Sequence, residues 1–154
     1  MRGCPPVERT LFHSRGERVS ALVTLSVRGI EDWDMIHGTY NTERFNEAAQ
    51  EMLINSGLVP LFKHVLMDNA SIHTASFEAA IQAAGGRVWR MPPYSAARLS
   101  PLDNGGFGLV VRYLQQHARE LAHLTMMEAL DHALRHCCNP AAARYCFYNC
   151  GYTY

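Results

Sequence analysis

The sequence has almost no lysine and no excess of either charge. Lys63 stands alone against thirteen arginines, and 14 basic residues balance 14 acidic ones, so the formal net charge is zero. A neutral chain gives no compositional support for nucleic-acid binding. Arginine recognises phosphate well, but a coding bias toward arginine explains its dominance as simply. Composition therefore leaves the partner open.

Long apolar runs and paired cysteine motifs are also missing. No run approaches the roughly 20 residues that cross a bilayer, and residues 1–6 are polar and broken by prolines, unlike a secretory signal. The five cysteines are an odd number and include no Cys-x-x-Cys pair. This pattern predicts neither a disulfide framework nor a zinc site. We expect a protein that is neither secreted nor embedded in a membrane.

What the sequence does contain is enough apolar residues, 48% of 154, for one ordinary core. Branched apolar residues predict a strand at 18–27, and 30–37 alternates as the returning half of a hairpin. Asn41 can cap a helix whose apolar positions run to Leu53. Gly57 and Pro60 are expected to close that helix.

The next segment has the order strand, helix, strand. Residues 64–67 form a short apolar strand, Thr74 can cap a helix to about Ala84, and 87–91 form another strand. This order predicts a parallel pair joined by a crossover helix. Beyond it we expect a long helix from Leu102 or Asp103 to Leu121, a helix at 125–136, and a tail rich in cysteine and aromatic residues.

Two acidic residues occupy positions suited to chemistry. Asp68 ends a buried strand and Asp103 begins a helix, with 34 residues between them. Open α/β folds place their sites at the carboxyl ends of parallel strands, and carboxylates are ligands that magnesium prefers. Two such ions can activate water and stabilise the leaving oxygen of a phosphodiester. Taken alone, each aspartate is better explained as a turn former or a helix cap, and it is the pair at this spacing that favours a site.

The motifs around these acids resemble those of one family. Val65–His73 (VLMDNASIH) resembles the second-acid motif of DDE-superfamily transposases of the mariner and related bacterial insertion-sequence type. Met91–Ser95 (MPPYS) is similar to the family's apolar-Pro-Pro-Tyr-Ser segment, and Leu99–Asp103 (LSPLD) resembles its third-acid motif. The spacing of the acids is typical of the family, and aspartate is a known variant at the third position. The resemblance covers about Gly3 to His117.

This resemblance implies an α/β, RNase-H-like fold: a mixed sheet flanked by helices, with three carboxylates that bind magnesium or manganese. It implies that Asp68 and Asp103 are catalytic metal ligands, and that Asn69 and His73 support the active edge. DNA is the implied partner and a homodimer is possible. The implied location is the nucleus for a eukaryotic protein and the cytoplasm otherwise. No nucleic-acid-binding residue is assigned.

The family's first acid has no counterpart in this sequence. In relatives it lies on a strand upstream of the Arg15–Gly16 pair, a position that falls before Met1 here. We therefore expect the first, central strand to be missing from this chain, which leaves two half-sheets with unpaired inner edges. Residues 7–12 or another chain could replace it. Asp32 and Asp34 belong to the hairpin and are expected to face solvent.

The sequence thus predicts a truncated RNase-H-like catalytic domain at 1–121 and a C-terminal helical tail, rich in cysteine and aromatic residues, at 122–154. The function expected is that of a transposase remnant, related to DNA cleavage and strand transfer at transposon ends but inactive as this chain. Two alternatives stay open. One is a non-catalytic interaction or dimerisation module, and the other is a complete enzyme whose start lies upstream of Met1.

Overall fold

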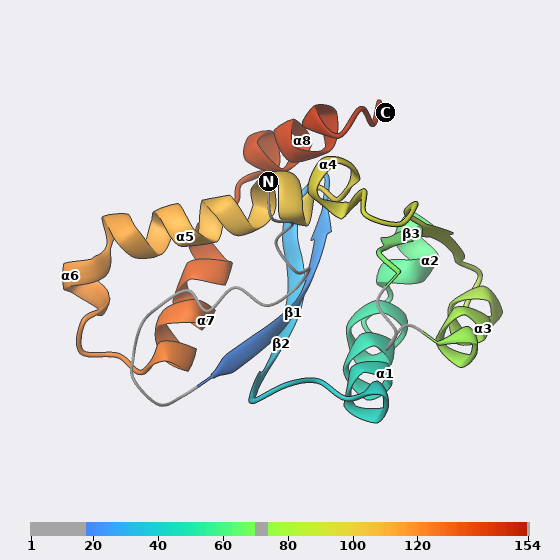
Figure 1. Ribbon diagram of the computed structural model, residues 1–154, viewed down its shortest axis with the longest axis horizontal. Coiled ribbons are helices and arrows are strands. Elements are labelled where there is room, and N and C mark those ends of the chain that lie inside the picture. The colour runs from blue at the N-terminus through green and yellow to red at the C-terminus, as the bar shows by residue number, and fades with distance from the viewer. Residues whose placement is uncertain (1–17, 70–73, 154) are drawn as a thin grey trace.

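The computed structural model describes residues 18–69 and 74–153 (Figure 1). Its elements follow the order β1 (Val19–Ser26), β2 (Gly29–His37), α1 (Thr42–Gln50), the π-helix η1 (Glu51–Asn55), α2 (Leu58–Phe62), β3 (His64–Met67), α3 (Ala75–Ala83), β4 (Arg87–Arg90), α4 (Ala96–Leu99), the π-helix η2 (Leu102–Gly106), α5 (Phe107–Gln116), α6 (Ala118–Leu121), α7 (Met126–His136) and α8 (Pro140–Asn149). None of the described helices is long and apolar enough to cross a membrane.

The four strands form two separate sheets. β1 and β2 pair antiparallel, whereas β3 and β4 pair parallel around the crossover helix α3. Within 18–69 and 74–153 the strands form two separate pairs, and no further strand joins β1 to β3. The expected absence of the central strand from this chain stays a prediction. The proposed substitute strand at 7–12 lies outside the described residues.

A β-bulge sets the faces of the hairpin. Leu25 pairs with Ile30 while Thr24 pairs with Asp32, so Glu31 is an extra residue in β2. Side chains alternate along a strand, and one inserted residue reverses that alternation. The bulge therefore places Ile30 on the same face as Trp33, although their spacing in sequence is odd.

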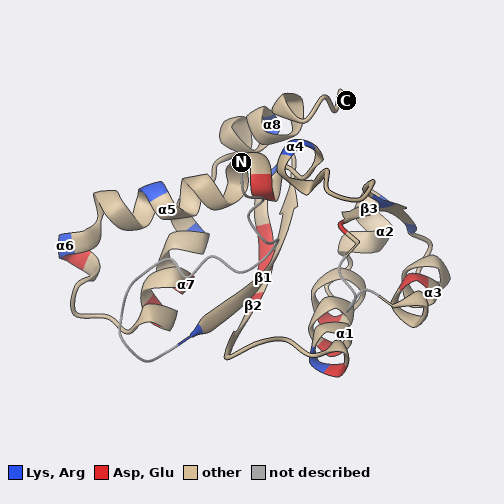
Figure 2. Ribbon diagram, viewed as in Figure 1, with Lys and Arg blue, Asp and Glu red and all other residues tan. Residues whose placement is uncertain are grey.

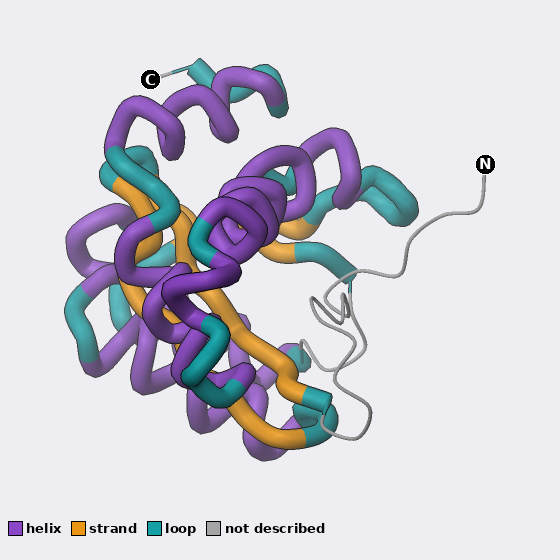
Figure 3. The backbone as a smooth tube through the Cα atoms, turned by 90° about the vertical axis from the view of Figure 1, so that its left-hand side faces the viewer, coloured by secondary structure: helices purple, strands orange, loops and turns teal. Residues whose placement is uncertain are grey.

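Helices cover the hairpin from both sides (Figures 1 and 3). One face packs on α5 and α7, where Val23 meets a buried cluster of Val110, Leu114, Leu121, Ala129, Leu130, Ala133 and Leu134. The other face contributes Leu22 and Ile36 to a second core formed by Tyr40, Phe45, Ala48, Ala49, Val59, Met67, Phe77 and Ile81. The second core joins α1, α2 and α3 to β3. The hairpin thus lies between two cores, and α7 shares one of them.

Two of the predicted helix boundaries are wrong. Pro60 does not end a helix but lies inside α2, where it is tolerated because the first turn of a helix needs no N–H from that position. The expected helix from 102 to 121 is divided into η2, α5 and α6. A Cβ added to Gly105 would lie 2.6 Å from Cys146 Sγ, and one added to Gly106 would lie 3.5 Å from Leu25. These glycines let η2 approach both α8 and the hairpin.

Candidate active site

Asp68 lies directly after β3, at the carboxyl end of a parallel strand. The ladder continues past the strand through a hydrogen bond of 2.9 Å from the Met91 N–H to the Met67 carbonyl. The Asn69 side-chain amide donates to the backbone carbonyl of Met91, which joins the ends of β3 and β4. Asn69 therefore ties the backbone next to Asp68 to the end of β4. His73, the other expected supporting residue, lies outside the described residues.

Asp103 lies in the first turn of η2 and is exposed to solvent. Its backbone N–H donates to the hydroxyl of Ser100 at 3.3 Å, and Ser100 is buried. The hydroxyl thereby satisfies one of the backbone donors at the start of this helical segment. The carboxylate is thus held at a helix start, as the sequence predicts.

The C-terminal helix braces the segment that contains Asp103. The Asn104 amide donates to Cys150 Sγ at 3.4 Å, and the Tyr152 hydroxyl donates to the Leu99 carbonyl at 2.9 Å. Burial, followed by the nearby negative charge of Asp103, raises the pKa of the Cys150 thiol. Cys150 therefore stays neutral beside the carboxylate. No local pattern around Cys150 or Tyr152 indicates this role, because the contacts span about fifty residues of sequence.

The two acids belong to different halves of the fold. Asp68 extends the β3–β4 sheet, whereas η2 packs on the hairpin through Gly106 and on α4, α5 and α8. Carboxylate oxygens have the right chemistry for magnesium or manganese. However, 18–69 and 74–153 contain no group of three acidic, histidine or cysteine side chains placed to hold a metal ion. Two carboxylates alone are an incomplete ligand set for such an ion.

The expectation that Asp34 faces solvent is wrong, whereas Asp32 is half-buried at the edge of a groove. Asp34 is only 26% exposed, and it accepts hydrogen bonds from the Tyr40 hydroxyl at 2.7 Å and from Arg44 Nη2 at 2.8 Å. The Asp32 carboxylate accepts from the Trp33 backbone N–H at 2.9 Å. Burial, reinforced by the hydrogen bond to Asp34, raises the pKa of Tyr40 well above its ordinary value. Asp34 joins the hairpin to α1 through Arg44, whereas the Asp32 carboxylate binds only the backbone of its own strand.

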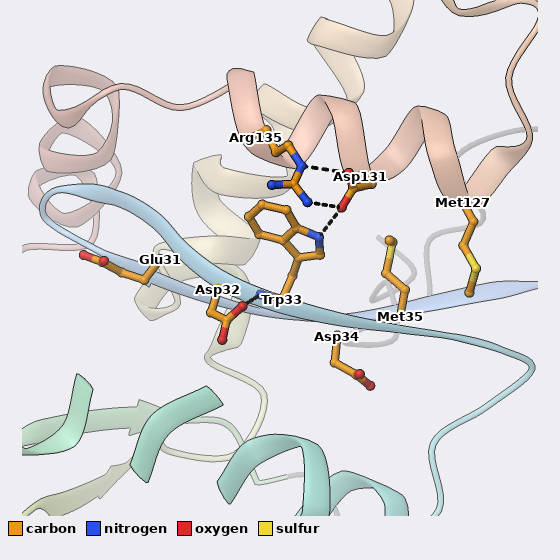
Figure 4. Close-up of a pocket in the computed structure, with 8 residues that line it drawn as sticks. All are labelled: Glu31, Asp32, Trp33, Asp34, Met35, Met127, Asp131 and Arg135. Carbon is orange, nitrogen blue, oxygen red and sulfur yellow. Dashed lines mark hydrogen bonds and ion pairs between the residues drawn. The ribbon is translucent and has the colours of Figure 1, made fainter. Parts of the chain in front are cut away.

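A shallow groove of about 460 Å³ lies between β2 and α7 (Figure 4) and is lined by Glu31, Asp32, Trp33, Asp34, Met35, Met127, Asp131 and Arg135. Its acids do not converge, because Asp34 and Asp131 point to opposite sides of β2 in Figure 4. Arginines also neutralise three of them: Arg28 binds Glu31, Arg44 binds Asp34 and Arg135 binds Asp131. The groove is therefore no second metal centre.

A parallel β3–α3–β4 unit beside an antiparallel hairpin, with helices on both faces, is an RNase-H-like arrangement. A family model described as DDE superfamily endonuclease matches residues 5–129, which include both motif acids. The chain belongs to the DDE superfamily of endonucleases.

Solved structures show the same fold. The chain is similar to the Mos1 transposase in a paired-end complex with the left transposon end, at 18% identity and a TM-score of 0.55, covering 97% of this chain and 48% of that one. It is also similar to the Mos1 strand transfer complex, at 16% identity and a TM-score of 0.56, covering 99% of this chain and 48% of that one. The Mos1 mariner paired-end complex with Mn gives 16% identity, a TM-score of 0.54, and coverage of 99% and 49%. The chain thus spans about half the length of these Mos1 chains. A comparison with curated proteins finds no match.

Proposed function

We propose that this chain is a part of the catalytic domain of a mariner-like DDE transposase. The reaction of such an enzyme is metal-dependent hydrolysis and strand transfer at transposon ends. The observation that supports this most is the family match over residues 5–129, within which Asp68 follows a parallel strand. The Mos1 neighbours are complexes with transposon DNA, which supports DNA as the partner of this chain as well.

Asp68 and Asp103 are the proposed metal ligands, and Asn69 is the proposed supporting residue. Bound magnesium or manganese would supply an activated water and stabilise the leaving oxygen of the phosphodiester. Asn69 contributes by its hydrogen bond to the Met91 carbonyl, which limits the movement of the neighbouring Asp68 backbone. His73 is proposed only from its place in the motif.

We further propose that the chain is inactive until another strand completes it. β1 and β3 each bond one neighbour in the described part of the fold, so each has a second edge available for pairing. A strand that bonds both edges would bring a third carboxylate between the two half-sheets. That strand would come from outside the described residues, either from this chain or from another one.

A plasmid-nicking assay tests this function. The chain as given is expected to leave supercoiled DNA intact in magnesium or manganese. Extending it with the coding sequence upstream of Met1 is expected to produce nicking that Asp68→Asn and Asp103→Asn each abolish. Glu120→Gln, at an exposed acid on α6, is the matched control and should keep activity.

Two results would contradict these proposals. Nicking by the unextended chain that disappears in Asp68→Asn refutes the inactivity. If the extended chain binds DNA but never cleaves it, the proposed enzymatic activity is refuted. That result favours the alternative, a non-catalytic interaction module. The same open edges favour that alternative, which predicts a stable dimer in light scattering of the purified chain.

A further inference from the structure

Among the described residues, one face of the β3–β4 sheet is largely exposed to solvent. The register pairs His64 with Arg87 and Leu66 with Trp89, and these four side chains share a face that we call the Trp89 face. On the opposite face Val65, Met67 and Val88 pack on the second core. His64, Arg87 and Trp89 are exposed, and Leu66 is half-buried.

Trp89 is the centre of this face and is held in place by its neighbours. It is 45% exposed, an unusual state for so large an apolar side chain. The Arg87 guanidinium lies over its ring at 4.2 Å, and its indole N–H donates to His64 Nδ1 at 3.0 Å. An exposed aromatic ring fixed by two contacts loses little conformational freedom when a ligand stacks on it.

The charge around Trp89 is positive. Arg87 and the neighbouring Lys63 are exposed, and neither forms an ion pair with any described residue. Arg90 belongs to the opposite face, where it pairs with Glu78 of α3. In Figure 2, β4 carries basic segments at the outer edge of the fold. Cations beside a half-exposed indole suit a ligand that has both phosphates and flat rings.

We propose that the Trp89 face binds single-stranded DNA, with a base stacked on Trp89 and a phosphate contacted by Arg87. In a duplex the bases are already stacked on one another, so the indole selects a single strand. The identification of the ligand as DNA rests on the proposed function. The description of the Trp89 face does not depend on that function. Because side chains alternate along a strand, Asp68 continues the series of His64 and Leu66. DNA lying along this face therefore leads toward Asp68.

Fluorescence anisotropy in EDTA tests this surface without any contribution from metal chemistry. The probes are a labelled 16-nucleotide oligothymidylate and a 16-base-pair duplex. The wild type should bind the single strand more tightly than the duplex, and Trp89→Ala should weaken that binding by about tenfold. Trp89→Phe should retain most of the affinity. Arg87→Gln should lower the slope of log K against log salt by about 0.7, as expected for the loss of one phosphate contact.

Matched exposed residues on other elements serve as controls. Tyr148→Ala removes an aromatic side chain that is 69% exposed on α8, and Arg119→Gln removes an exposed arginine on α6. Neither should change binding. Each of four results would overturn the proposal: equal losses of affinity in these controls, unchanged binding by Trp89→Ala, tighter binding of the wild type to the duplex, or no binding by the wild type. If Trp89→Ala weakens binding while the controls do not, in a chain that never cleaves DNA, the proposed binding surface is supported. Only the proposed enzymatic activity is then refuted.

Discussion

Trp33 and Asp131, 98 positions apart in the sequence, are joined by a hydrogen bond of 3.0 Å from the indole N–H to Oδ1 (Figure 4). Arg135 completes the contact, because its guanidinium binds the same carboxylate at 2.8 Å and lies 5.0 Å from the centre of the Trp33 ring. This cluster ties β2 to α7. It therefore connects the hairpin to a helix that ends beyond the residues matched by the family model.

Acid should weaken this junction. The hydrogen bond from Arg135, with that from Trp33, holds the pKa of Asp131 below its ordinary value of 3.8. A carboxyl whose pKa is lower in the folded state stabilises the fold above its unfolded pKa, and this contribution is lost as the pH falls through the folded pKa. Asp131→Asn should lower the melting temperature at pH 7, and the difference from wild type should shrink below about pH 4. Glu120→Gln should show no such convergence.

Tyr40→Phe should destabilise the protein by about 1–2 kcal/mol, because Asp34 loses a buried hydrogen bond to a charged acceptor. Tyr40 is 8% exposed, so its ring packing is preserved by phenylalanine. Urea denaturation measures the change. Tyr145→Phe, at a side chain that is 64% exposed, is the control and should match the wild type. A Tyr40→Phe protein as stable as the wild type would show that Arg44 alone satisfies Asp34.

Lys63→Gly should stabilise the fold. Lys63 has φ of 62° and ends α2 with a hydrogen bond from its N–H to the Val59 carbonyl at 2.7 Å. A residue with a Cβ pays roughly 1–2 kcal/mol in this left-handed conformation, partly offset by the greater freedom of glycine in the unfolded chain. We expect a net gain of about 0.5–1 kcal/mol by thermal or urea unfolding. Lys63→Ala keeps the Cβ and should give no gain.

Two glycine substitutions should have opposite effects. A Cβ at Gly86 would lie 2.5 Å from a Val59 methyl and 2.8 Å from an Ile81 methyl, both in the second core. Gly86→Ala should therefore cost about 1–3 kcal/mol through overpacking. Gly108, inside α5, has open space around it, and Gly108→Ala should add about 0.5–1 kcal/mol. Chemical denaturation of both variants checks the sign of each change.

Short-range sequence patterns predicted the strands and helices whose formation depends mainly on neighbouring residues. The parallel pair of 64–67 and 87–90 is confirmed, because short apolar runs flank helix α3, which ends at Ala83 and is followed by Gly85 with a positive φ. Asp34 was missed because its partners, Tyr40 and Arg44, are polar residues with no local signature. The division of the helix after Leu102 depends on how closely η2 approaches Leu25 and Cys146. No pattern within that segment reveals such a distance.

The meeting of Asp68 and Asp103 in one metal centre stays a prediction. Sequence and family motifs placed each carboxylate at the end of its element, and the fold has both at those positions. The distance between the two carboxylates depends on how the two half-sheets are placed relative to one another. A strand that bonds both half-sheets would fix that distance. That arrangement is tertiary and lies beyond any local pattern.

The bulge at Glu31 makes the hairpin intolerant of slippage. In an unbulged hairpin a shift by one residue exchanges the two faces of a strand. Here Ile30 and Trp33 reach the same core only when the extra residue is accommodated between them. A shift by one residue would drive Asp32 or Asp34 into the apolar contact with α5 and α7. A single inserted residue thus helps to fix the alignment of β1 with β2.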